Sequence, residues 1–270
     1  MIVDFHTHIF PERIADRTVS HLAKSSGITP YSSGDESGLL RGMCEGGVAV
    51  SINLPVLTRA EQFDSILDFA TKINEKCYTG ARIISFAGVH PEIFDVECAF
   101  EKIKRLGFLG VKIHPDYQGT FIDDEKYIKI LSLAKKYDLI TVTHAGVDGA
   151  YRGDAIRCTP YRTMRALDKI GGYSKLVLAH LGGNEMFDEV YNTLAGEDVY
   201  FDTAYILHVA TRDMLLKIID KHSAKRVLFA TDSPWRCIKD EVEIVRDLPL
   251  RDEEISDILS NNARRLLNGD

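Results

Sequence analysis

The sequence alternates short apolar segments with longer segments of helical periodicity, and this alternation limits the possible folds more than any other feature. Eight apolar segments are expected to form β-strands, at residues 2–8, 48–54, 83–89, 109–114, 139–144, 175–181, 198–203 and 226–231. Amphipathic segments such as Glu61–Tyr78, Asp123–Tyr137 and Pro160–Ile170 lie between them, with apolar residues at the spacing of one helix face. Strands that alternate with helices predict a parallel β/α architecture.

Eight such units in 270 residues match a (β/α)8 TIM barrel, which takes about 250 residues. We therefore expect an α/β fold with a single domain, residues 1–270. A short excursion after the first strand, Ser25–Gly38, could act as a lid. The alternative is an open doubly wound sheet, which would bind its ligand at a switch point of the strand order.

The composition argues against several classes of partner. The net charge of −7 argues against a nucleic-acid-binding surface. No apolar run approaches the roughly 20 residues that span a membrane. No signal peptide is visible. The five cysteines are widely spaced and contain no Cys-x-x-Cys pair, which fits a reducing, cytoplasmic environment.

Polar residues stand at the ends of the expected strands. His6 and His8 are two residues apart in the first strand, so their side chains point to the same face. Two strand histidines with separate hydrogen-bond partners would be the simpler interpretation. However, further polar residues also fall at strand ends, where a barrel gathers its active site; they are His90, Lys112, His114, His144, His180 and Asp232.

The donor set indicates a metal centre. A carboxylate at Asp232, directly after an apolar strand, would need a cation or several hydrogen-bond donors. Together with three imidazoles it would suit one divalent ion, most readily Zn²⁺ and also Mn²⁺, Fe²⁺ or Co²⁺.

Several motifs, in this order, resemble the amidohydrolase superfamily and within it the amidohydrolase-2 branch of barrel hydrolases, decarboxylases and lactonases. The resembling segments are Asp4–Pro11, Gly110–Pro115, Thr143–Gly146, Ala179–Gly183, Thr231–Pro234 and Asn262–Leu267. The resemblance spans nearly the whole chain. We expect no additional β-sandwich domain, which many members carry.

The resemblance implies metal ligation by His6, His8, His144 and Asp232. His180 then corresponds to a histidine that contacts the substrate or the metal-bound water. Lys112 stands where binuclear members carry a carboxylated lysine, but this branch usually holds one metal, so Lys112 could instead contact the substrate or pair within the core. His114 could be a second-shell donor, a substrate contact or a ligand.

Three functions follow from this site. The first is hydrolysis of a small-molecule ester, lactone or amide by a metal-activated water, with Asp232 as the proton acceptor and His180 as a water-orienting or oxyanion-stabilising group. The second is non-oxidative decarboxylation of an aromatic or unsaturated acid. The third is a barrel that binds a small ligand or a metal without catalysis.

The substrate is not determined by the sequence. Several loop residues could line a pocket: Tyr31, Tyr117, Gln118, Asp148, Tyr151, Arg152, Tyr205 and Trp235. Of these, Tyr31, Tyr117, Arg152 and Trp235 are the substrate-binding candidates. The expected partner is a small molecule, with neither nucleic acid nor membrane involved, and the resemblance is compatible with a homodimer.

Overall fold

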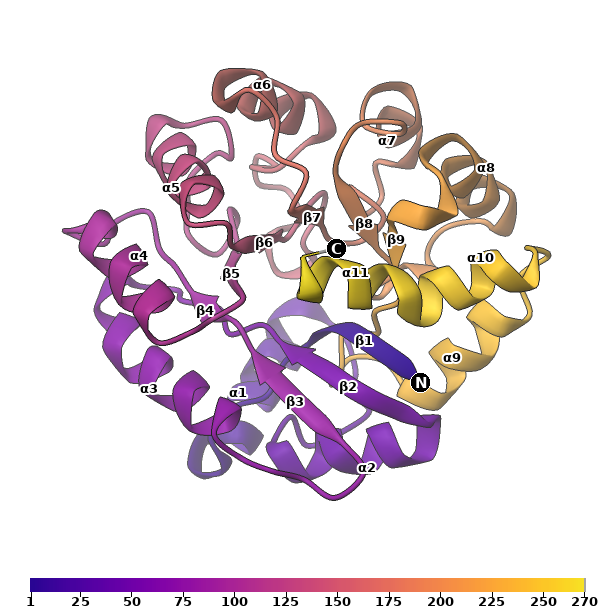
Figure 1. The fold of residues 1–270 in the computed structure, drawn as a ribbon, viewed down its shortest axis with the longest axis horizontal. Coiled ribbons are helices and arrows are strands. Elements are labelled where there is room, and N and C mark those ends of the chain that lie inside the picture. The colour runs from indigo at the N-terminus through magenta and orange to yellow at the C-terminus, as the bar shows by residue number, and fades with distance from the viewer. Residues whose placement is uncertain (270) are drawn as a thin grey trace.

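A computed structural model describes residues 1–269 and shows a ring of parallel strands surrounded by helices (Figure 1). The strands are β1 (Ile2–Thr7), β2 (Val48–Asn53), β3 (Arg82–Ser85), β4 (Ala87–Gly88), β5 (Gly110–Ile113), β6 (Ile140–Thr143), β7 (Leu176–Leu178), β8 (Tyr200–Asp202) and β9 (Val227–Leu228). They pair in sequence order as β1-β2-β3 and β4-β5-β6-β7-β8-β9, and every pair is parallel. The predicted (β/α)8 fold class is confirmed.

The ladder of strand pairs is interrupted at two places within residues 1–269. The predicted strand 83–89 is split at Phe86, whose amide donates to Asn53 O at 3.0 Å. Between β9 and β1, the amide of Phe5 donates to Phe229 O at 2.9 Å and that of Asp232 donates to His6 O at 2.9 Å. Single backbone hydrogen bonds therefore connect β1 to the segment after β9, although no regular ladder joins them.

The helices cover the outside of the strands and one end of the barrel. They are α1 (Glu12–Ser26), α2 (Glu36–Gly46), α3 (Phe63–Asn74), α4 (Val96–Arg105), α5 (Glu125–Lys136), α6 (Pro160–Ile170), α7 (Phe187–Thr193), α8 (Arg212–His222), α9 (Ile238–Arg246), α10 (Asp252–Ser256) and α11 (Asn262–Asn268). A π-helical turn, Asp257–Asn261, joins α10 to α11. None of the described helices is long and apolar enough to cross a membrane.

The core has two parts. A large cluster fills the space between the strands and the outer helices. A smaller cluster lies inside the ring of strands and includes Val3, Phe5, Phe86, Val142 and Leu228 together with Ala263 and Leu266 from α11. Because α11 contributes to this inner cluster, it closes one end of the barrel, and the polar site lies at the other end.

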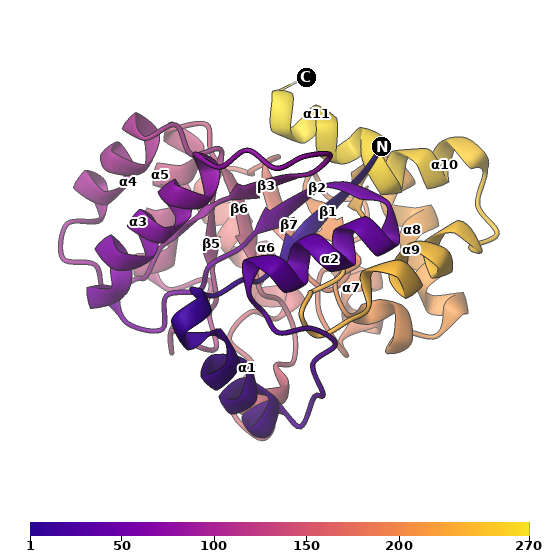
Figure 2. The same ribbon diagram turned by 90° about the horizontal axis from the view of Figure 1, so that it is seen from below.

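The predicted excursion after β1, Ser25–Gly38, is only partly a loop. Residues 25–26 complete α1 and residues 36–38 begin α2, so only 27–35 form a connecting loop. This loop is fixed to the barrel, since the Phe10 amide donates to Gly34 O at 2.8 Å and the Tyr31 amide donates to Pro234 O at 2.7 Å. Figure 2 shows α1 at the end of the molecule opposite α11, which is the end that carries the site.

Candidate active site

Three predicted metal ligands converge at the carboxyl ends of β1 and β9. His6 Nε2 lies 3.2 Å from His8 Nε2, and Asp232 Oδ1 lies 3.2 Å from His8 Nε2 and 3.6 Å from His6 Nε2. Ligand atoms about 2.0–2.1 Å from a tetrahedral Zn²⁺ are about 3.3 Å from one another. The three donor atoms therefore have the spacing of ligands around a single divalent ion.

Hydrogen bonds at the far side of each imidazole turn these donors toward one another. His8 Nδ1 donates to Leu54 O at 2.8 Å, and His6 Nδ1 pairs with Asp202 Oδ2 at 2.8 Å. Such partners fix the ring orientation and leave Nε2 for a metal, as is usual for metal-binding histidines. Burial lowers the pKa of His6 well below its ordinary value, so this imidazole is neutral, as a ligand must be.

Asp232 sits on a strained turn that aims its carboxylate at the two histidines. Its φ of 64° is left-handed, and its amide is held by His6 O. Behind it, Asp4 accepts hydrogen bonds from the hydroxyl and amide of Thr231, at 2.6 and 3.0 Å. Burial alone would raise the pKa of Asp232, but the contacts with His8 and His6 lower it, so the carboxylate is ionised.

His144 and His180 form a second pair of donors next to this group. His144 Nδ1 lies 3.0 Å from His180 Nε2, and His180 Nδ1 donates to Ala204 O at 2.8 Å. The His180 ring lies 5.5 Å from that of His6 and 4.7 Å from that of His144, measured between centroids. The structure thus brings all five predicted residues together, with His144 separated from the first three donors by the His180 ring.

A glycine allows the loops after β6 and β7 to approach this closely. Gly146 has a φ of +84°, and a Cβ atom there would lie 2.1 Å from the amide nitrogen of Asn184. The Asn184 amide donates to Ala145 O at 2.9 Å, and the Val147 amide donates to Asn184 O at 3.0 Å. These bonds fix the segment after His144 against the segment after His180.

Lys112 lies against the first group of donors. Its Nζ atom is 3.2 Å from His6 Nε2, and its side chain is among the largest that are fully buried. Burial lowers the pKa of Lys112 to about 8, against the charges of Asp202 and Asp232. This position suits either a carboxylated lysine or a cation stabilised by the charges of Asp202 and Asp232.

A second set of polar residues surrounds the outer face of His144. The rings of His114 and His144 stack at 4.3 Å, and Asp148 Oδ2 lies 3.5 Å from His114 Nε2 and 4.0 Å from His144 Nε2. Asp116 Oδ2 lies 3.9 Å from His144 Nε2. Burial raises the pKa of Asp116 to about 6 and also raises that of Asp148.

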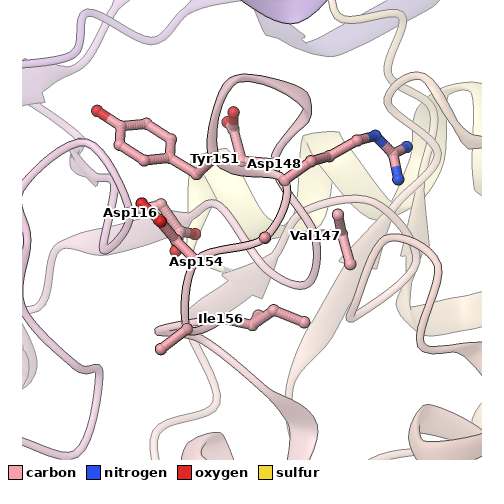
Figure 3. A pocket seen from close by; sticks show the side chains of 9 residues that line it. Asp116, Val147, Asp148, Tyr151, Asp154 and Ile156 are labelled. Carbon is pink, nitrogen blue, oxygen red and sulfur yellow. The ribbon is translucent and has the colours of Figure 1, made fainter.

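A cavity of about 240 Å³ opens beside these carboxylates, lined by Asp116, Asp148, Arg152 and neighbouring residues of the loop 147–156. Figure 3 shows the carboxylates of Asp116, Asp148 and Asp154 and the phenol ring of Tyr151 around it. The ring of Tyr117 packs edge-on against that of Tyr151, with centroids 5.3 Å apart.

The predicted substrate contacts are placed unequally. Arg152 lines the cavity, but its guanidinium binds Glu185, with one N–O distance of 3.0 Å. Tyr117 contacts the cavity residue Tyr151 but does not line the cavity itself. Tyr31 is 63% exposed. Trp235 is half-buried, and its amide donates a hydrogen bond to the carbonyl oxygen of Asp232. Among the described residues, two groups have the spacing of metal ligands, His6, His8 and Asp232 and also His114, His144 and Asp148. His90 belongs to neither; its ring accepts a hydrogen bond from the Glu92 amide at 3.1 Å.

Two residues of the site are absent from the sequence-based prediction. Asp202 binds His6, and its Oδ1 atom accepts from the amides of His180 and Ala204 at 2.8 and 3.1 Å; its position at the end of an expected strand was an available signal. Asp116 follows His114 by two residues, in a loop where a carboxylate is ordinarily solvated, so no sequence pattern singles it out.

The fold and these donors define a (β/α)8 barrel with a rim suited to a divalent metal ion. The family model for amidohydrolases matches residues 3–269. The chain belongs to this family, whose enzymes include hydrolases and decarboxylases, and the predicted resemblance is confirmed.

Solved structures of similar fold have low sequence identity. A 2,6-dihydroxybenzoate decarboxylase from Rhizobium has 19% identity and a TM-score of 0.69, covering 100% of this chain and 99% of its own. A dihydroxybenzoic acid decarboxylase from Polaromonas sp. JS666, with bound manganese and the inhibitor 2-nitroresorcinol, has 17% identity and a TM-score of 0.71, covering 99% and 96%. A putative amidohydrolase from Staphylococcus aureus has 18% identity and a TM-score of 0.67, covering 99% of both chains. No curated protein matches the sequence.

Proposed function

We propose that this protein is a metal-dependent hydrolase that acts on a small-molecule ester, lactone or amide. The observation that carries the proposal is the convergence of His6 Nε2, His8 Nε2 and Asp232 Oδ1 within 3.2–3.6 Å of one another. A divalent ion held there, most readily Zn²⁺, would lower the pKa of a bound water molecule toward about 7 and so supply a nucleophile at neutral pH.

The protein's own residues then handle the proton and the developing charge. Asp232 is ionised and faces the two histidines, so its carboxylate can accept a proton from the attacking water and return it to the leaving group. His180 has its Nδ1 proton bound to Ala204 O. Its Nε2 atom lies 3.0 Å from His144 Nδ1 and is the ring atom left to orient the water or stabilise an oxyanion.

The proposed number of metal ions depends on the roles of His144 and Lys112. We propose one ion, held by His6, His8 and Asp232. The family resemblance adds His144 as a fourth ligand, which would require its Nδ1 atom to turn from His180 toward that ion. His144 Nδ1 faces His180 Nε2, and Lys112 Nζ faces His6 Nε2. Metal analysis of the purified protein and of Lys112→Met tests the count, because a lysine-bridged pair would lose about one equivalent in the variant, whereas a single-ion site would not.

Decarboxylation of an aromatic acid is the second candidate, and the decarboxylases among the structures of similar fold favour it. In that reaction Lys112 would supply positive charge near the substrate's carboxylate or an adjacent oxygen. Hydrolysis would use the ionised Asp232 next to both histidines as its proton acceptor. Arg152, one of the candidates for binding an acid, is already paired with Glu185.

Product analysis separates the two reactions. The metal-loaded protein is incubated with a panel of esters, lactones and amides and with a panel of hydroxybenzoates, and release of alcohol or amine is measured against release of CO₂. Asp232→Asn should abolish turnover of any active ester, lactone or amide while the protein stays folded by circular dichroism. CO₂ release alone would replace hydrolysis by decarboxylation, and a metal-free protein inactive on both panels would favour a non-catalytic barrel.

A further inference from the structure

The cavity beside the proposed metal ligands has a carboxylate wall with little cationic compensation. Of the residues that line it, Asp116, Asp148 and Asp154 are acidic and Arg152 is basic. Arg152 is 61% exposed at its side chain and is bound to Glu185. Its charge is therefore already paired, and Arg157, which lies 3.6 Å from Asp116 Oδ1, is not a lining residue. The lining residues themselves carry a net negative charge.

Asp116 supplies a buried oxygen with no partner in residues 1–269. Its side chain is 3% exposed. Its Oδ1 atom accepts from the Arg157 amide at 3.2 Å and lies 3.6 Å from Arg157 Nη1, whereas Oδ2 has no hydrogen-bond partner. Leaving a buried acceptor unsatisfied costs about 1–3 kcal/mol, and more for a charged group. A donor that enters the cavity would remove this cost.

Asp148 presents a second carboxylate on the same wall. Its Oδ1 atom accepts from the Ala150 amide at 2.8 Å, while Oδ2 lies 3.5 Å from its nearest charge partner, His114 Nε2. Its side chain is 12% exposed, and no neighbouring Lys or Arg side chain among the described residues forms an ion pair with it. This carboxylate would be stabilised by a cation.

One phenol ring completes the wall, and a second packs against it. Tyr151 lines the cavity and packs edge-on against Tyr117, whose ring in turn packs on His114 at 4.4 Å. Aromatic faces attract cations, by about 0.5–2 kcal/mol. Carboxylates and phenol rings together favour a cationic nitrogen over a carboxylate, which like-charge repulsion would exclude from this side.

We propose that the cavity recognises its substrate through a positively charged nitrogen group, an amidine or an amine, held by Asp116 and Asp148. The reacting carbonyl would then be turned toward His6, His8 and Asp232. This proposal adds a substrate class to the hydrolase function proposed above. Only the orientation of the reacting carbonyl rests on that function; the charge preference of the cavity does not. The size of the cavity, about 240 Å³, suits a group no larger than a single substituted ring.

Three planar probes of matched size test the charge preference by isothermal titration calorimetry on the zinc-loaded protein. They are benzamidine, which is a cation, benzamide, which is neutral, and benzoate, which is an anion. We expect benzamidine to bind at least tenfold more tightly than benzamide. Equal affinities, or tighter binding of benzoate that persists after the zinc is removed with a chelator, would overturn the proposal.

Substitutions locate the binding group. Asp148→Asn should weaken benzamidine binding at least tenfold and leave benzamide within twofold. Asp168→Asn, at an exposed position on α6, removes the same charge away from the cavity and should change neither affinity. Benzamidine binding that is unaffected by Asp148→Asn would refute the assignment, and Asp148→Asn decides the question even if Asp116→Asn does not fold.

The calorimetric measurement does not depend on turnover, so the two proposals can fail separately. Zinc-loaded protein that binds benzamidine through Asp148 but hydrolyses no member of the ester, lactone and amide panel would support the cationic cavity and refute the hydrolase function. Turnover of neutral substrates without selective benzamidine binding would support the function and refute the cavity's preference.

Discussion

His222 is expected to make the protein less stable in mild acid. The ring is 2% exposed and stacks on Phe201 with centroids 3.8 Å apart. Its Nδ1 atom accepts a hydrogen bond from the Gly196 amide at 3.1 Å, an arrangement that protonation of Nδ1 would destroy. Burial, with a smaller contribution from the charge of Arg226, lowers the pKa of His222 from 6.5 to about 4.

The sign of the effect follows from proton binding in the two states. Between pH 6.5 and 4 the unfolded chain binds a proton at this histidine and the folded chain does not, so the free energy of unfolding falls as the pH falls. With these two pKa values the loss from pH 7.5 to pH 5 is about 2 kcal/mol, since each pKa unit is worth about 1.4 kcal/mol. Asp4 and Glu241, whose pKa values burial raises to about 7 and about 8, act in the opposite direction, so the comparison must be between variants.

Urea unfolding of the metal-free protein and of His222→Gln at pH 7.5 and pH 5 measures this contribution. His222→Gln lacks the packing of the ring at both pH values, so it should be less stable than the wild type at pH 7.5. On acidification to pH 5 only the wild type loses a further ~2 kcal/mol of unfolding free energy at this position. The difference in unfolding free energy between the two proteins should therefore shrink by that amount. His21→Gln, at an exposed position on α1, controls for the loss of one imidazole. A wild-type to His222→Gln difference that is the same at both pH values within about 0.5 kcal/mol would refute the reasoning.

Three further predictions concern the site and its support. Asp202→Asn removes the charged acceptor of His6 Nδ1 and should weaken zinc binding by about 10–100-fold in a chelator competition assay; an unchanged affinity would contradict the orienting role. Gly146→Ala places a Cβ atom 2.1 Å from the Asn184 amide nitrogen at a φ of +84°, so it should lower the free energy of unfolding by more than about 1 kcal/mol, and wild-type stability would show that the loops separate freely. Leu266→Ala empties part of the inner core closed by α11, with an expected loss of about 2–5 kcal/mol in urea unfolding; a loss below 1 kcal/mol would mean that α11 does not seal the barrel.

The sequence was informative wherever a local pattern decides the structure. The helix Pro160–Ile170 has the predicted bounds because Thr159 caps it, proline suits its first turn, and Gly171 takes the left-handed conformation that ends it. The strand-end histidines were likewise identifiable, because each closes an apolar segment whose position in a barrel is fixed.

The remaining features depend on distances between segments that are far apart in the chain. The facing of His144 Nδ1 toward His180 rather than toward His6 follows from the relative register of three strands, which no pattern within one strand reveals. The pairing of Arg152 with Glu185 joins two loops, and the interruption at Phe86 depends on how β3 meets its neighbours. The helical residues 25–26 and 36–38 were assigned to the excursion because the Gly, Ser and Pro residues of the loop 27–35 dominate the local signal.

The location of α11 has a consequence for how the chain folds during synthesis. The inner core needs Ala263 and Leu266, and the donor group needs Asp232 next to His6 and His8. A ribosome-bound chain that ends before residue 226 has neither, so Val3 and Phe5 would remain exposed and His6 and His8 would lack their carboxylate partner. Metal acquisition should therefore follow translation of the last helices, and a nascent chain of this protein is expected to rely on chaperones until then.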